Sequence, residues 1–509
     1  MLLSGRTGGA AVARKDRAPW PLGIEAETWL LVGITMLAAV LRFATISSQG
    51  YWLDESQAVH ELRLSFGGML SAWSSYEGNP PLYLLIAWPW AKLFGTGEAG
   101  LRSLSALLGI ALVPLIYLCA RELVSRRAGV VAAAFVAVNP FMIWYSQEAR
   151  EYMLLGTLSA ASLLFFARAW RTRSSRELAW WALLSALALL TQYFAGFLVA
   201  AEGLALVYRA RTRASVLALG ALGILEVALI PHVTPLLTGR EQFIVSLPLS
   251  LRVQQVPVTF AMNTLYQSGI VSYGLIGAAA LAAILIVLLV VGAGERELRG
   301  VALAAALAAA VLLVPLALAV AGHDDYIARA LMPGWIPLAV VVAAACTADG
   351  ARIAGATLAV VLLAIFVYAG VRIDGDAQFQ RPDWRGVAAA LGRPSATRAI
   401  VAYDGVFAAA PLSVYLTGVP WAGPGMAPQA PAPVRVSEVD VVGSVYDSLS
   451  RLPVGVRLIG RRAVDSYEVD RFALAAPWDM APAAIGARAA QLLSPEPPRA
   501  RVLIQPPPA

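Results

Sequence analysis

The sequence has few charged residues, few histidines and few cysteines. Charged residues make up 14% of the chain, whereas a soluble domain usually carries about a quarter. Hydrophobic residues make up 59% of the 509 positions, and the mean hydropathy is +0.68. The two cysteines, Cys119 and Cys346, lie in apolar runs, so no disulfide framework is predicted. This composition indicates a polytopic membrane protein.

Several motifs of soluble enzymes are also missing. The sequence contains no glycine-rich phosphate-binding loop, no dinucleotide fingerprint and no Ser-His-Asp arrangement, which argues against a soluble enzyme that uses a nucleotide sugar. The net charge of +7 comes mostly from arginines at the edges of apolar segments. That pattern sets membrane topology and does not indicate nucleic-acid binding. The basic leader has no small-residue cleavage site, so a removable signal peptide is not expected.

Eleven apolar segments are candidates for membrane spans, each of which takes roughly 20 residues. They are 27–46, 103–120, 128–147, 153–169, 178–193, 195–208, 215–232, 271–292, 300–320, 330–347 and 353–371. Arginine-rich turns fall on every second connection, so the positive-inside rule predicts a cytoplasmic N-terminus and an extracytoplasmic C-terminal region. We therefore expect an α-helical, multi-pass protein of the cell (inner) membrane with about eleven transmembrane helices.

The chain divides into three predicted regions. Residues 1–26 form a cytoplasmic tail, 27–372 a transmembrane catalytic domain, and 373–509 an extracytoplasmic domain. The first external loop, 47–102, should contain short helices along the membrane surface, because 80–94 is too short to span and is interrupted by a proline.

Segments with strand and helix patterns alternate in the C-terminal region, which predicts a small α/β domain. The strand patterns lie at 398–405, 434–443, 455–464 and 499–505, and the helix patterns at 384–392, 407–418 and 482–493.

An acidic pair, Asp54 and Glu55, follows the first apolar segment in "YWLDESQAVHEL". Ionisable residues at a membrane are costly and are functional candidates by default. Because partial burial raises the pKa of a carboxylate, either residue could serve as a general base on an acceptor hydroxyl. A solvated loop is the alternative interpretation.

Further polar residues lie in loops predicted on the same face. Arg150 and Arg329 could grip a phosphate with their forked donors. Alternatively, Arg150 could form a local salt-bridge turn with Glu148 and Glu151. The long side chain of Arg329 could likewise do no more than extend its charge to the membrane–water interface. His60 is interpreted as a structural or acceptor-side polar group. Two more candidates for substrate binding in these loops are Asn79 and Gln147.

No motif predicts a cofactor. The run His323, Asp324 and Asp325 could hold a divalent cation, but three consecutive side chains rarely aim at one centre. We therefore predict no metal site and keep a divalent cation as the alternative.

Four motifs occur in a characteristic order: "DE" at 54–55, "NPPLY" at 79–83, "LR" followed by "SALLG" at 101–109, and "YSQEAREY" at 145–152. In this order and spacing, the sequence resembles the bacterial, protein O-mannosyltransferase-like branch of the GT-C-fold glycosyltransferases, which is related to the lipid A aminoarabinose transferases. The resemblance is strong over 27–200 and weak over 320–390.

This resemblance implies a polyprenyl-phosphate-sugar donor, transfer on the extracytoplasmic face and inversion at the anomeric carbon. The acceptor could be a lipid, a glycan or a protein. Asp54 would be the general base, with Glu55 beside it in the same motif. Arg150 would lie near the donor phosphate, supported by Tyr152, in a second conserved loop that also holds Glu148.

The sequence departs from the family pattern at two places. Arg329 corresponds to a family "RY" motif, but Ala330 follows it. Gln192 stands where such proteins often have histidine.

Two other classes of protein remain as alternatives. A lipid-linked substrate transporter or flippase should show inverted repeats and charges near the bilayer midplane, whereas here the charges gather on one predicted face and no repeat is evident. A non-catalytic cell-envelope assembly protein would tolerate substitution of the acidic pair.

Overall fold

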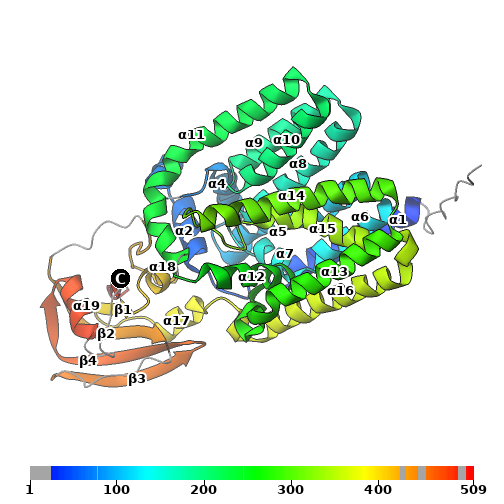
Figure 1. Ribbon diagram of the computed structural model, residues 1–509. Coiled ribbons are helices and arrows are strands. Elements are labelled where there is room, and N and C mark those ends of the chain that lie inside the picture. The colour runs from blue at the N-terminus through cyan, green and yellow to red at the C-terminus, as the bar shows by residue number, and fades with distance from the viewer. Residues whose placement is uncertain are drawn as a thin grey trace, which may run out of the picture.

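The computed structural model describes residues 24–76, 78–244, 246–424, 432–444, 454–490 and 500–508. A bundle of helices makes up most of the molecule, and a small mixed-sheet domain packs against one end of it (Figure 1). Most of the predicted tail, up to residue 23, lies outside the described residues.

Each predicted apolar segment is helical, because these runs are long and apolar. The helices are α1 (Ile24–Phe43), α5 (Glu98–Leu123), α6 (Arg126–Val138) with α7 (Pro140–Ser146), α8 (Tyr152–Thr172), α9 (Ser175–Leu189), α10 (Ala195–Ala210), α11 (Arg213–Ile244), α13 (Gly274–Gly292), α14 (Glu295–Val320), α15 (Met332–Cys346) and α16 (Arg352–Gly375).

Among the described residues, seven helices are long and apolar enough to cross a membrane, or eight if α6 and α7 count as one span. These two helices meet at 58° because Asn139 is extended and caps α7, and Pro140 cannot continue the hydrogen-bond ladder of α6. Helices α9, α10 and α15 have 15, 16 and 15 residues, short of the roughly 20 that a span takes. The multi-pass architecture is confirmed, with shorter helices at these predicted spans.

Three short helices occupy the predicted first loop, namely α2 (Leu53–Arg63), α3 (Phe66–Tyr76) and α4 (Leu82–Phe94). They share a small hydrophobic core that includes Leu62 of α2 and Tyr83 of α4. Between α11 and α13 lie α12 (Leu249–Met262) and the 3₁₀ helices η1 (Asn263–Ser268) and η2 (Ile270–Tyr273). Two more 3₁₀ turns, η3 (Asp349–Ala351) and η4 (Ala377–Phe379), flank α16.

The C-terminal domain contains a five-stranded sheet in the order β3-β4-β2-β1-β5. Its strands are β1 (Arg398–Ala402), β2 (Val434–Ser444), β3 (Val456–Val464), β4 (Tyr467–Met480) and β5 (Arg501–Gln505). Strands β1 and β2 pair in parallel, and the other neighbours are antiparallel.

In the described part of the domain, three helices cover this sheet. One hydrophobic core joins it to α17 (Trp384–Leu391) and α18 (Val406–Tyr415), and a second joins its other face to α19 (Pro482–Ala490). The predicted α/β domain is confirmed. Strand β4 was not predicted, because its "ALAAP" run has weak strand propensity.

The domain is attached to the helical bundle through α18 and α2, which pack together. The Tyr415 hydroxyl donates to Glu98 of α5 at 2.7 Å and accepts from the backbone N–H of Tyr51 at 2.7 Å. Arg385 of α17 donates to the carbonyls of Ser47 and Ser48. These contacts hold the domain beside the first turn of α2, which contains the acidic pair.

Candidate active site

The first turn of α2 separates the two acidic side chains. Successive residues of an α-helix point about 100° apart, so Asp54 and Glu55 face different surroundings. The side chain of Asp54 is 24% exposed, whereas that of Glu55 is fully buried. Only Asp54 is therefore placed to meet a substrate.

Glu55 forms a buried, bidentate ion pair with Arg102 of α5. Nε and Nη2 of Arg102 each lie 2.7 Å from a carboxylate oxygen of Glu55, which also accepts from the Ala149 N–H at 2.9 Å. Burial by itself would raise the pKa of Glu55, but Arg102 and Arg381 outweigh it and hold that pKa below its usual range. Glu55 thus stays charged and ties α2 to α5 and to the loop before α8.

Asp54 faces Arg329, which lies in the loop between α14 and α15. Nη1 of Arg329 is 3.7 Å from Oδ2 of Asp54, and its side chain is 25% exposed. The guanidinium lies 5.6 Å from the ring centre of Trp52 and 5.9 Å from that of Tyr152. Two aromatic rings and a carboxylate therefore position a cation that remains partly accessible.

A second ion pair fixes the loop that contains Arg329. Arg252 of α12 donates through both terminal nitrogens to Asp324, at 2.7 Å for Nη1, and to the carbonyl of Tyr326 at 2.8 Å. This hydrogen bonding lowers the pKa of Asp324. Among the described residues, no three His, Cys, Asp or Glu side chains gather as metal ligands do.

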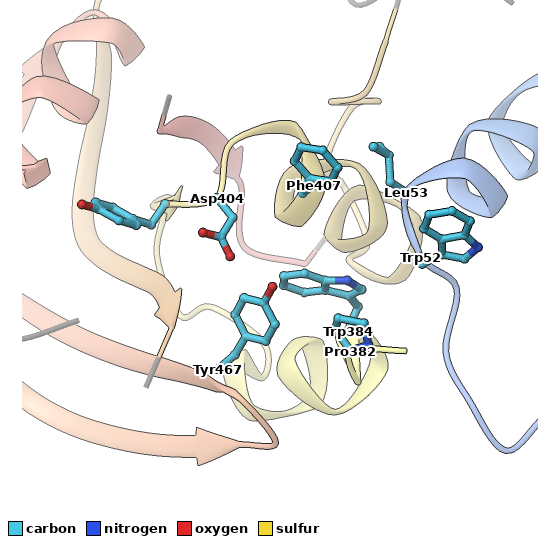
Figure 2. A pocket seen from close by; sticks show the side chains of 8 residues that line it. Trp52, Leu53, Pro382, Trp384, Asp404, Phe407 and Tyr467 are labelled. Atoms are coloured by element: carbon cyan, nitrogen blue, oxygen red, sulfur yellow. The ribbon is translucent and has the colours of Figure 1, made fainter. Parts of the chain in front are cut away.

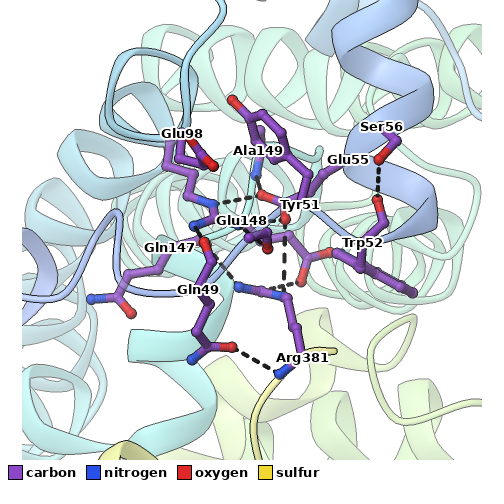
Figure 3. Close-up of polar contacts among 12 residues, drawn as sticks. Gln49, Tyr51, Trp52, Glu55, Ser56, Glu98, Gln147, Glu148, Ala149 and Arg381 are labelled. Atoms are coloured by element: carbon purple, nitrogen blue, oxygen red, sulfur yellow. Dashed lines mark hydrogen bonds and ion pairs between the residues drawn. The ribbon is translucent and has the colours of Figure 1, made fainter. Parts of the chain in front are cut away.

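The loop after α7 is joined to the C-terminal domain by Arg381. Its Nη2 lies 2.8 Å from the Glu148 carboxylate, its Nη1 donates to the carbonyl of Gln147, and its backbone N–H donates to Gln49 (Figure 3). The guanidinium also lies 4.3 Å from the ring centre of Trp144.

Glu148 is almost completely buried beside this arginine. Burial raises the pKa of Glu148 to about 7; Arg381 opposes the shift, and the negative charges of Glu55 and Asp54 add to it. The structure therefore brings Glu148 within electrostatic reach of Asp54 and Glu55, as the sequence motifs predict.

Arg150 forms an ion pair with Glu151, with Nε 2.9 Å from Oε2, and is 4% exposed. Glu151 also accepts from the side-chain amide of Asn79 at 2.6 Å. Gln147 donates to the Arg42 carbonyl at the end of α1. These candidates link the loop before α8 to neighbouring elements and expose little surface.

Tyr152 and His60 occupy different parts of the site. The ring of Tyr152 packs against the guanidinium of Arg329, and the other charged neighbours of Tyr152 include Asp54, Arg150 and Glu151. His60 stacks on Trp421 of the C-terminal domain with ring centres 4.5 Å apart. Burial and the nearby Arg63 lower the pKa of His60.

Three arginines at the site were not among the predicted site residues. Arg102 lies in the "LR" motif, so the sequence did contain a signal for it, and Arg381 lies shortly before α17. Arg252 lies in a segment without a recognised motif. Each neutralises a buried or half-buried carboxylate, and such pairing is visible only once distant segments have been placed together.

The chain is similar to a known protein family and to solved structures. The family model described as dolichyl-phosphate-mannose-protein mannosyltransferase matches residues 78–235. The solved structure of ArnT from Cupriavidus metallidurans bound to undecaprenyl phosphate is similar with a TM-score of 0.51 and 13% identity, over 88% of this chain and 98% of that one. For arabinofuranosyltransferase AftD from Mycobacteria, the TM-score is 0.46 with 17% identity, over 88% of this chain and 40% of that one. No curated protein matches the chain.

The likeness to ArnT shows the fold, and the family match covers the segment with the "YSQEAREY" motif. Together they confirm the GT-C fold and the class predicted from the sequence, an integral-membrane glycosyltransferase.

Proposed function

We propose that this membrane glycosyltransferase moves a sugar from a polyprenyl phosphate to an acceptor hydroxyl, with Asp54 as the general base. The observation that supports this most directly is the partly exposed pair of Asp54 and Arg329. It places a proton acceptor beside a cation that can bind a phosphate. The donor class follows the family description, which names dolichyl-phosphate mannose, and the solved relative bound to undecaprenyl phosphate.

The reaction balances with these groups alone. The Asp54 carboxylate takes the proton of the acceptor hydroxyl, and the hydroxyl oxygen forms a bond to the anomeric carbon. The bond between that carbon and the phosphate oxygen breaks, and the phosphate leaves with the electron pair. Attack opposite the leaving group inverts the anomeric centre. A phosphate needs no proton to leave once Arg329 neutralises its charge.

Arg329 is the proposed donor-phosphate ligand because its guanidinium is accessible and its loop is fixed by Arg252. The ring of Tyr152 also contacts the Arg329 guanidinium through a cation–π interaction. Arg150, almost buried and paired with Glu151, is proposed to hold the residues before α8 in place, and with them Tyr152. Glu55 is proposed to position α2 and not to accept a proton itself.

The enzyme is proposed to act in the cell membrane with its C-terminal domain and active site on the extracytoplasmic face. The support is the arrangement of arginine-rich turns, together with the contact between that domain and α2.

The proposed function is tested with purified protein in detergent, supplied with polyprenyl-phosphate sugars that carry a labelled hexose or pentose. We expect acceptor-dependent release of polyprenyl phosphate and a glycoside of inverted configuration, identified by NMR. A flippase would move the donor across vesicles and leave its sugar–phosphate bond intact. Intact donor after incubation with extracts of every cell-envelope fraction would contradict the proposal.

A further inference from the structure

A cleft of about 480 Å³ lies between the start of α2 and the C-terminal domain. Its size falls within the range of roughly 300–1,000 Å³ that is typical of small-molecule pockets. Figure 2 shows Trp52 and Leu53 on one side of the cleft, and Trp384, Phe407 and Tyr467 on the side of the domain. The remaining lining residues are Pro382, Tyr403 and Asp404.

The lining is aromatic and acidic. Trp52, Trp384, Tyr403, Phe407 and Tyr467 supply rings, and Asp404 supplies a carboxylate. Tyr467 hydrogen-bonds to Asp404, which fixes both polar groups in the cleft. Among the described residues that line it, there is no lysine, arginine or histidine.

The cleft adjoins the proposed catalytic base. Trp52 and Leu53 immediately precede Asp54, and the ring of Trp52 lies 5.6 Å from the guanidinium of Arg329. The cleft therefore begins at the residue before Asp54, at the end of α2 that also contains the proposed base. Arg329, the proposed ligand of the donor phosphate, thus contacts a residue that lines the cleft without lining the cleft itself.

We propose that this cleft binds the acceptor and that the acceptor is a neutral glycan. This inference rests on the proposed function. Sugar rings present an apolar C–H face, which packs against aromatic rings, and an edge of hydroxyl groups, which donate to carboxylates and phenol oxygens. The lining offers both kinds of partner. An acceptor with phosphate groups would place negative charge beside Asp404, and no cationic side chain lines the cleft to compensate for it.

Phe407 and Asp404 allow the proposal to be tested without disturbing the proposed catalytic residues. The side chain of Phe407 is 40% exposed, so Phe407→Ala should fold. Asp404→Asn keeps the size of the side chain and removes its charge. Ile459→Ala is a matched control, because Ile459 is an exposed apolar residue of the same domain, outside the cleft.

The first experiment uses the full-length protein in detergent on an array of neutral oligosaccharides printed beside phosphorylated oligosaccharides and peptides. We expect binding to neutral oligosaccharides that weakens at least tenfold in Phe407→Ala and in Asp404→Asn, and is unchanged in Ile459→Ala. The melting temperature of each variant checks that it is folded. The proposal is overturned if neutral oligosaccharides do not bind, if both cleft variants bind like wild type, or if the phosphorylated glycans or peptides are preferred.

A second readout separates this inference from the proposed function. Slow hydrolysis of the donor by water should be unchanged in Phe407→Ala, while the KM for a glycan acceptor rises at least tenfold. Glycan binding in a protein that does not cleave the donor would contradict the proposed function and leave the cleft assignment standing. Transfer with an unchanged acceptor KM in both cleft variants would contradict the cleft assignment alone.

Discussion

The carboxylate of Asp54 lies 3.7 Å from the guanidinium of Arg329, although one residue is in α2 and the other in the loop before α15. Both side chains are about one quarter exposed. The neighbouring carboxylate, Glu55, is instead buried against Arg102. An accessible carboxylate therefore lies beside a cation, and the buried pair of Glu55 and Arg102 holds the helix turn that contains it.

Arg329 should contribute to donor binding through its planar, forked donors. We expect Arg329→Lys to weaken the binding of polyprenyl phosphate by about 10–100-fold, because a charge-assisted hydrogen bond contributes roughly 1.5–3 kcal/mol. Arg329→Ala should weaken it further. The measurement is a titration of detergent-solubilised protein with the lipid phosphate. Arg462→Ala, an exposed arginine of β3, should bind as wild type does, and equal affinities for all of these proteins would contradict the assignment.

Glu55 should matter for stability more than for chemistry. Glu55→Gln leaves the buried guanidinium of Arg102 without its carboxylate, so we expect a loss of about 3–5 kcal/mol in the free energy of unfolding. A lower melting temperature in detergent would show this. The double variant Glu55→Gln with Arg102→Met should recover part of the loss, since neither charge is then left alone. An unchanged melting temperature together with abolished turnover would instead make Glu55 a catalytic residue.

Glu148 should make stability depend on pH. The folded protein retains the Glu148 proton up to a pKa of about 7, whereas the unfolded chain releases it near 4.5. The folded state therefore binds more protons between these values, and its free energy of unfolding falls as pH rises from about 4.5 to 7. The slope from this one group is at most about 1.4 kcal/mol per pH unit.

The check is the melting temperature of wild type and Glu148→Gln between pH 5 and 7.5. We expect the wild type to lose stability relative to Glu148→Gln as pH rises, whereas Glu295→Gln, an exposed substitution, should track the wild type. Parallel curves for wild type and Glu148→Gln would show that Glu148 does not titrate in this interval.

The sequence predicts the helices of the bundle well, because a long apolar run has few other ways to bury its backbone polar groups. It also places Asp54, Glu148 and Arg329 in loops between those helices. It does not show which member of the acidic pair is exposed, since that depends on Arg102 in another helix. The role of Arg381 likewise depends on how the C-terminal domain packs against the loop with Glu148.

Strand β4 illustrates the same limit within the C-terminal domain. Its alanines and Pro477 do not favour a strand locally, yet it lies between β3 and β2 and pairs with both. Hydrogen bonds to both neighbouring strands stabilise the extended conformation that local propensity does not favour. The segment can therefore be recognised as a strand only once the sheet is assembled.

The central claim is that Asp54 accepts the proton of the attacking hydroxyl. The most direct test is the single-turnover rate of sugar transfer from a labelled polyprenyl phosphate by wild type, Asp54→Asn and Asp479→Asn, where Asp479 is an exposed carboxylate of β4. We expect Asp54→Asn to bind the donor normally and to transfer sugar about 10²–10⁴-fold more slowly, the usual contribution of a general base, with Asp479→Asn unchanged. A transfer rate of Asp54→Asn within a factor of about two of wild type would contradict the mechanism.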